Sequence, residues 1–68
     1  MEFSKNLIKL MGTRNVSSYR LSKDIGVSDS LIGYYRMGKN SPSLENLVKI
    51  ADYFEISIDK LIGRSFPN

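Results

Sequence analysis

The chain has 68 residues without cysteine or histidine, which excludes disulfides, the usual zinc sites and Cys–His nucleophiles, and makes an enzyme the least favoured class. No apolar run approaches the roughly 20 residues that span a bilayer, so we expect one small cytoplasmic domain with no metal, cofactor or small-molecule ligand. The net charge is +3, and residues 1–44 hold seven bases against three acids, which suits a surface facing a polyanion or, alternatively, a solvated basic face.

The first predicted element is a helix that begins at Phe3. Apolar residues then recur with helical spacing at Leu7, Leu10 and Met11. Asn15 readily takes the left-handed conformation that ends a helix. We therefore expect this helix to run up to Asn15.

A second, short helix follows. Ser17 is suited to cap its N-terminus, and Leu21 and Ile25 lie four residues apart, on one face. Gly26 then ends the helix. Only residues 26–28 separate it from the next segment, and so short a connection forces two helices to cross steeply, as in a helix-turn-helix unit.

The third predicted helix covers residues 29–37, with Ser28 as its cap and Gly38 as its end. At about 3.6 residues per turn, Ile32 and Tyr35 share the face that would join the core. The opposite arc is polar or small except for one tyrosine and one methionine: Asp29, Ser30, Gly33, Tyr34 and Met37. Such a helix fits a DNA major groove, which is about 12 Å wide.

Two further helices are predicted after a polar loop that contains Pro42. Ser43 is suited to cap residues 44–54, and Ser57 to cap residues 58–62 before Gly63. The apolar side of the longer helix carries Leu44, Leu47, Val48, Ile50, Ala51 and Phe54. No run alternates with the period of a strand, so we expect an all-α protein of five short helices.

The run SSYRLSKDIGVSDSLIGYYRMGKNSPS, followed by SLENLVKIADYFEISIDKLIG, resembles the Cro and phage-repressor type (XRE-like) of helix-turn-helix DNA-binding domain. The likeness extends from Phe3 to Gly63. It implies a compact five-helix bundle of the lambda-repressor-like type over residues 1–63, with the motif at about 17–37 and a tail at 64–68. It also implies a sequence-specific transcriptional regulator, a repressor that binds a two-fold operator in double-stranded DNA as a homodimer.

The resemblance also assigns site residues. It implies that the residues in contact with base edges are Asp29, Ser30 and Tyr34. It implies that the residues in contact with phosphates are Ser17, Ser18, Lys39, Asn40 and Ser41. We add Gly33 to the base-contacting group, because it costs the helix roughly 1 kcal/mol relative to alanine and close approach of the backbone to DNA would compensate. Tolerated drift at an exposed site is the alternative.

Other roles stay open for several of these residues. Asp29 can accept from the N4 amino group of cytosine, or it can simply favour the dipole at the start of its helix. Tyr34 can contact a thymine methyl or a phosphate, or only cover the neighbouring turn. The positive charge of Lys39 can interact favourably with a phosphate and with the C-terminus of the third helix at the same time. General electrostatics is the role expected of three arginines: Arg14, Arg20 and Arg36.

The sequence departs from the family pattern at three places. Ser18 stands where glutamine is common, and serine is too short to reach both a phosphate and the third helix. Ser22 stands where alanine is preferred, so its hydroxyl needs a partner. Met11 and Arg36 stand where many members pair an arginine with a glutamate, so this ion pair is absent.

A dimer surface and a second function class complete the expectations. Ile56, Ile62 and Phe66 are candidates for the dimer interface, with packing of the fifth helix as the alternative. The competing function is a protein-interaction adaptor on the same scaffold, in which Asp29 and Tyr34 meet a protein. The two functions differ in salt dependence, which is strong only for phosphate binding.

Overall fold

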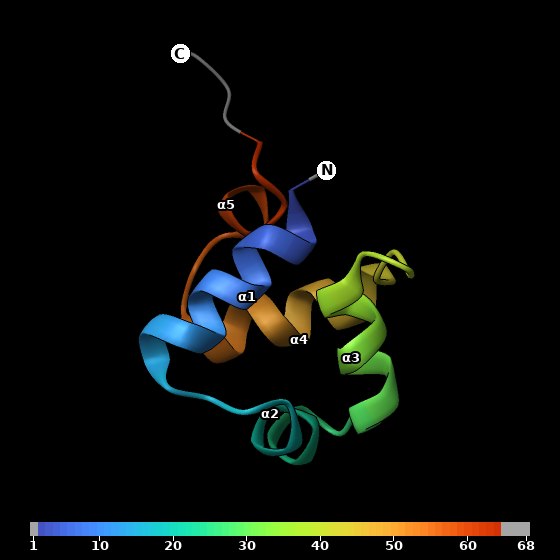
Figure 1. The fold of residues 1–68 in the computed structure, drawn as a ribbon. Helices are drawn as coiled ribbons and strands as arrows, with labels where there is room; N and C mark the ends of the chain where they lie inside the picture. The colour runs from blue at the N-terminus through green and yellow to red at the C-terminus, as the bar shows by residue number, and fades with distance from the viewer. Residues whose placement is uncertain (1, 65–68) are drawn as a thin grey trace.

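The computed structural model describes residues 2–64, and this part of the chain folds into α-helices without a strand. In chain order they are α1 (Phe3–Arg14), α2 (Ser18–Ile25), α3 (Asp29–Met37), α4 (Leu44–Phe54) and α5 (Ile58–Ile62) (Figure 1). The predicted all-α, five-helix fold is confirmed. Of the predicted tail, residues 65–68 lie outside the described residues. Each helix of residues 2–64 is too short or too polar to cross a bilayer.

Local capping chemistry sets the helix ends. Four helices begin after a serine whose hydroxyl accepts from the backbone N–H three residues on, at 3.0 to 3.2 Å: Ser17, Ser28, Ser43 and Ser57. Each helix ends at a left-handed residue, with φ between 57° and 79°: Asn15, Gly26, Gly38, Glu55 and Gly63. All four predicted caps and the predicted end at Asn15 are confirmed.

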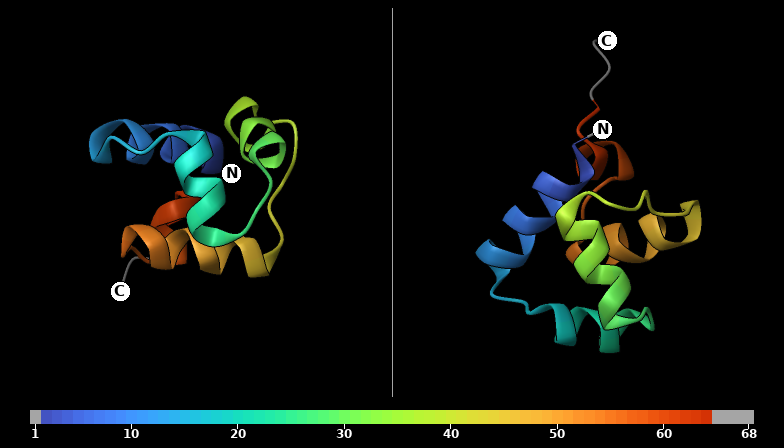
Figure 2. Two further views of the ribbon diagram at one scale, coloured as in Figure 1. Left: turned by 90° about the horizontal axis from the view of Figure 1, so that it is seen from below. Right: turned by 45° about the vertical axis from the view of Figure 1, so that its right-hand side comes forward.

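The core draws on every helix. Its largest fully buried side chains are Leu7, Leu21, Ile32, Tyr35, Ile50, Phe54 and Leu61. Complete burial of one such aliphatic side chain contributes roughly 1.5–3 kcal/mol. Seen from below, α1 and α4 lie on opposite sides of the domain and α2 crosses between them (Figure 2). This arrangement leaves one flank of α3 uncovered.

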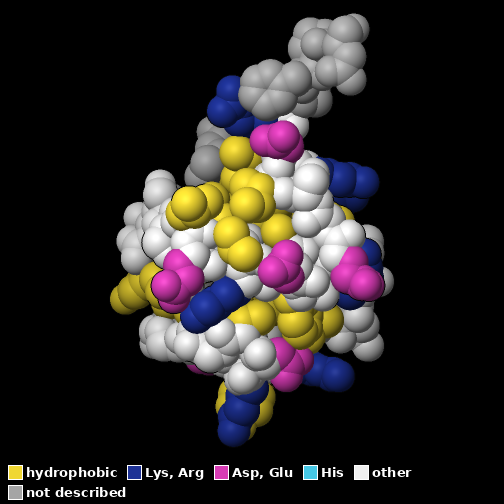
Figure 3. Space-filling model, turned by 180° about the vertical axis from the view of Figure 1, so that it is seen from behind, with side chains coloured by type: hydrophobic (Ala, Val, Ile, Leu, Met, Phe, Trp, Pro, Cys, Tyr) yellow, Lys and Arg dark blue, Asp and Glu magenta, His cyan; other side chains and the backbone are white. Residues whose placement is uncertain are grey.

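The apolar side of α4 is wider than the surface that covers it. Ile50, Ala51 and Phe54 are buried, whereas Leu44 is 70% exposed and Val48 is 39% exposed. Hydrophobic side chains gather on the face seen from behind, among several Asp and Glu side chains (Figure 3). The sequence pattern marks the apolar side correctly, but it does not show how far the short α5 extends over it.

Candidate nucleic-acid interface

A tight turn sets the angle between α2 and α3. Gly26 adopts a φ of 71°, which a larger side chain would strain. The carbonyl of Ser22 accepts from the N–H groups of Gly26 and Val27, at 2.9 and 3.1 Å. Val27 is buried, so the turn is anchored in the core. As a result α3 crosses α2 steeply (Figure 2) and presents its outer side to solvent.

Contacts from two other helices hold the inner side of α3. Ile32 and Tyr35 are buried, and the ring of Phe3 packs edge-on against that of Tyr35 with centroids 5.4 Å apart. The Ser4 hydroxyl donates to the Tyr35 carbonyl at 2.6 Å. The Asn46 amide donates to the Tyr35 hydroxyl at 2.9 Å. α1 and α4 therefore help α2 to fix the position and rotation of α3.

The outer side of α3 carries the residues expected to read bases. Asp29, Ser30 and Tyr34 are exposed, and Tyr34 keeps 45% of its surface accessible. Within residues 2–64 these side chains form no hydrogen bond or ion pair, so their polar groups are available to a partner. Met37 is 60% exposed on the same side. Groove insertion requires this exposure, but the individual base contacts stay predictions.

Gly33 lies in the middle of this outer side. A Cβ atom built on it would meet no atom of the described chain within 4 Å, apart from its own helix and chain neighbours. Packing inside the domain therefore does not require a glycine here. The reason for it lies outside the monomer, or there is none and the position tolerates it.

The residues expected to hold phosphates form two groups. Ser17 and Ser18 begin α2, where the Ser17 hydroxyl is used as the helix cap. Residues 39–41 lie exposed in the loop beyond the C-terminal end of α3 (Figure 1). The side chains of residues 39–41 have no hydrogen-bonding partner in the described part of the chain. One group therefore lies at the start of α2 and the other just beyond the end of α3.

Two of the departures from the family pattern find partners. The Ser22 hydroxyl is buried, and it donates a hydrogen bond to the Tyr19 carbonyl at 2.7 Å, so its hydrogen-bonding requirement is met. The Arg36 Nη1 atom donates to the Ser18 Oγ atom at 2.8 Å and joins α3 to the start of α2. Sequence reasoning missed this bond. The only signal was a long donor at position 36, where the family often places an acid.

The other two arginines have structural partners. The Arg14 guanidinium donates to the Phe54 carbonyl at 3.2 Å. Arg20 lies 3.7 Å from the Asp24 carboxylate, which also accepts from the Tyr53 hydroxyl at 2.7 Å and so connects α2 to α4. The hydrogen bond to Asp24 raises the pKa of Tyr53 above its ordinary value. Both arginines thus contribute local contacts as well as charge.

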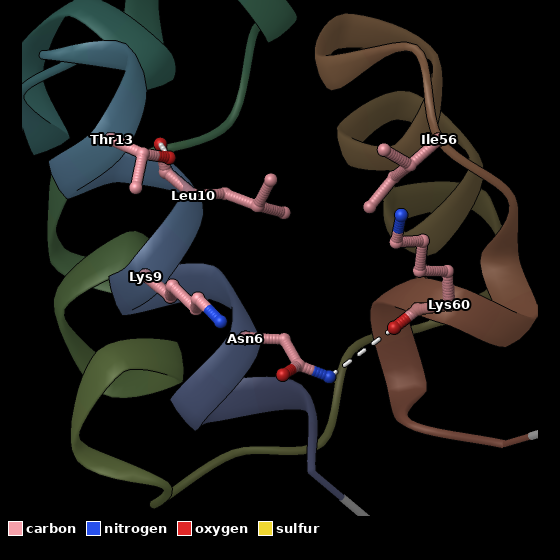
Figure 4. Close-up of a pocket in the computed structure, with 6 residues that line it drawn as sticks. All are labelled: Asn6, Lys9, Leu10, Thr13, Ile56 and Lys60. Atoms are coloured by element: carbon pink, nitrogen blue, oxygen red, sulfur yellow. Dashed lines mark hydrogen bonds between the residues drawn. The ribbon is translucent and has the colours of Figure 1, made fainter.

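Two of the three candidate dimer residues lie in the described part of the chain. Ile56 and Ile62 are half-buried, whereas Phe66 lies outside the described residues. Ile56 lines a groove of about 270 Å³ between α1 and the segment around α5 (Figure 4). The other lining residues are Asn6, Lys9, Leu10, Thr13 and Lys60. The Asn6 amide bridges the groove to the Lys60 carbonyl at 3.3 Å.

Comparison with known proteins places this geometry in a family. Residues 6–66 match the family model of the Cro/C1-type HTH DNA-binding domain. The chain is 39% identical over 64 residues to the cryptic phage CTXphi transcriptional repressor RstR of Vibrio cholerae, covering 94% of this chain and 57% of RstR. It is 32% identical over 63 residues to the transcriptional activator BcrR of Enterococcus faecalis, covering 93% of this chain and 31% of BcrR.

A solved structure gives the same result. The crystal structure of a transcriptional regulator from Listeria innocua superimposes with a TM-score of 0.87 at 29% identity, covering 97% of this chain and 62% of that one. This chain therefore spans less than two thirds of the length of each of these relatives. The relatives regulate transcription and are not enzymes.

Proposed function

We propose that this chain, which belongs to the Cro/C1-type helix-turn-helix DNA-binding domain family, is a sequence-specific transcriptional regulator that inserts α3 into the major groove of double-stranded DNA. One observation carries the proposal. The inner side of α3 is locked by Ile32 and Tyr35, while the polar groups of its outer side are exposed and have no partner in residues 2–64. Such a regulator acts where the DNA is, which we expect to be the cytoplasm.

Base reading is assigned to the outer side of α3. The Asp29 carboxylate is suited to accept from the N4 amino group of cytosine, and it would repel phosphate if the helix were misplaced. The Tyr34 ring is suited to contact a thymine methyl group. Ser30 can donate or accept at a base edge, and Gly33 would let the backbone approach the groove closely.

Phosphate contacts would fix the register of α3. Ser17 and Ser18 are assigned to one side of the groove, where the first amides of α2 also point outward. Lys39, Asn40 and Ser41 are assigned to the other side, through the loop beyond Gly38. These contacts position the domain without selecting a sequence.

We assign a homodimer that binds two half-sites about 34 Å apart, with Ile56, Ile62 and Phe66 at the interface. Half-burial of Ile56 and Ile62 in the monomer supports a role in burying apolar surface against a second copy. Occlusion of a promoter needs no surface beyond the DNA-binding one, so repression is the simplest mode of action. The relation to RstR supports it, although BcrR shows that this family also contains activators.

A salt titration tests the proposal. On a duplex selected for binding, log affinity should fall linearly with log salt between roughly 50 and 200 mM. Lys39→Ala should reduce the magnitude of the slope by about 1, because one phosphate contact is lost. Lys49→Ala, which removes the same charge from α4, is the matched control and should leave the slope nearly unchanged.

A protein-interaction adaptor is the second candidate. Tyr34 and Met37 on α3 and Ile8 on α1 are large hydrophobic residues with 45%, 60% and 47% of their surface exposed, which suits contact with a protein. Weak binding to every duplex, with the same slope for the Lys39→Ala variant and the wild-type chain, would favour this function over DNA reading.

A further inference from the structure

Arg36 carries a positive charge that no acid in residues 2–64 neutralises. Its side chain is exposed, it forms no ion pair within 4 Å in that part of the chain, and its one hydrogen-bonding partner is the Ser18 hydroxyl. By contrast, Arg20 and Lys49 each lie within 4 Å of a carboxylate. The guanidinium of Arg36 therefore keeps both its charge and most of its five donors for a partner.

The surface around Arg36 is hollowed at two places. One hollow of about 490 Å³ is bordered by Ser17, Ser18 and Arg36. A second hollow of about 350 Å³ is bordered by Gly33, Arg36 and Met37. Ile8 of α1 borders both. Arg36 thus stands between the start of α2 and the outer side of α3.

The chemistry of the Ser18–Arg36 pair suits an anion. A hydroxyl has one donor and two acceptor lone pairs, so Ser18, which accepts from Arg36, keeps its O–H free to donate. The guanidinium has further N–H groups beside the same oxygen. A phosphate oxygen that accepts from Ser18 would therefore come within reach of Arg36 as well.

We propose that Arg36 and Ser18 together bind one phosphate of the DNA backbone. The assignment rests on the proposed function and adds a contact to it. Serine alone is too short to reach both a phosphate and α3, and Arg36 makes that connection from the opposite side, with a charge added. The pair thereby couples the position of α3 to the phosphate that α2 holds.

Among residues 2–64, Asp29 is the one acidic residue that borders the same hollow as Ser17, Ser18 and Arg36. Its carboxylate disfavours an anion on its own side. Arg36 is not paired with it within 4 Å. The phosphate is therefore held on the Ser18 side, and Asp29 is left to the base edges.

The test measures duplex affinity against salt for the wild-type chain, Arg36→Gln, Ser18→Ala and the double variant. Arg36→Gln should weaken binding roughly 10-fold, as expected for the loss of a charge-assisted hydrogen bond. It should also reduce the magnitude of the slope of log affinity against log salt by about 0.9. Ser18→Ala should weaken binding with the slope nearly unchanged. The double variant should bind much more tightly than the product of the two single losses predicts, because both groups serve one phosphate.

Lys49→Gln is the control, since it removes one positive charge from α4, and its slope should stay nearly that of the wild-type chain. Thermal unfolding of each variant excludes a folding defect, and little change is expected because the Ser18–Arg36 bond is exposed. The shared phosphate contact is wrong, and the proposed function stands, if the wild-type chain binds DNA and Arg36→Gln has the same slope as the wild-type chain. The same conclusion follows if the affinity loss of the double variant equals the product of the two single losses. If the wild-type chain binds no duplex, both are wrong.

Discussion

The Asn46 side chain on α4 donates a hydrogen bond to the hydroxyl of Tyr35 on α3, with 2.9 Å between Nδ2 and Oη. The same tyrosine packs against Phe3 and accepts at its carbonyl from Ser4, both on α1. Tyr35 therefore has contacts with α1 and with α4, which lie on either side of it in the core. The orientation of the outer side of α3 depends on this tyrosine, although it would never touch DNA.

Tyr35→Phe should lower the free energy of unfolding by about 1 kcal/mol or somewhat more, because the amide of Asn46 loses its acceptor in a partly buried site. The ring contact with Phe3 is kept. Urea unfolding measures the change. Tyr34→Phe, next to it but exposed, is the matched control and should change stability by less than about 0.5 kcal/mol. Equal effects of the two substitutions would show that the buried hydroxyl does not hold α3.

Gly33→Ala should make the free domain more stable by up to roughly 1 kcal/mol, because the added methyl group enters open space and alanine favours the helix. If the backbone of α3 approaches DNA at this point, the same substitution weakens duplex binding. Stability and affinity therefore move in opposite directions. Gly12→Ala, a glycine within α1 that also has open space, is the control for stability. A more stable variant with unchanged affinity would leave Gly33 as a tolerated residue.

The contact between Tyr53 and Asp24 predicts a dependence of stability on alkaline pH. The hydrogen bond from the Tyr53 hydroxyl to Asp24 raises the pKa of Tyr53 in the folded state. The folded chain therefore holds the phenol proton more tightly than the unfolded chain does. The contribution is complete below the unfolded pKa of about 10 and is lost as pH rises through the folded pKa. Melting temperatures of the wild-type chain and Tyr53→Phe should therefore converge above about pH 10. A difference that is constant with pH would contradict the linkage.

Asp29→Asn should raise affinity for unrelated DNA, because a carboxylate close to the phosphates is replaced by a neutral amide of similar size. At a base pair that Asp29 reads, the same change should cost about 1–3 kcal/mol of discrimination. Competition between a selected duplex and random duplex measures both effects. Asp52→Asn on α4 is the control for a general change of charge. If both variants behave alike, Asp29 acts only through net charge.

Local chemistry explains why so much of the fold is predictable from the sequence. Ser17, Ser28, Ser43 and Ser57 cap helices through contacts three residues away, which depend little on the rest of the chain. The inner side of α3 follows from helical periodicity, since Ile32 and Tyr35 recur at its spacing.

Contacts between helices are harder to predict. The bond from Arg36 to Ser18 spans 18 positions, and it depends on how α2 and α3 are placed by the core. Leu44 and Val48 lie on the predicted apolar side of α4 and are nevertheless exposed, which periodicity alone does not predict. Periodicity gives the side on which a residue lies, and packing decides whether a neighbour reaches it.

The central claim is that the outer side of α3 reads base edges. Its most direct test is selection of bound duplexes from a random pool with the wild-type chain, Asp29→Asn and Tyr34→Ala. We expect the wild-type chain to recover a two-fold site, and each variant to lose its preference at a different position within the half-site. Recovery of the same site with the same preferences by all three proteins would contradict the claim.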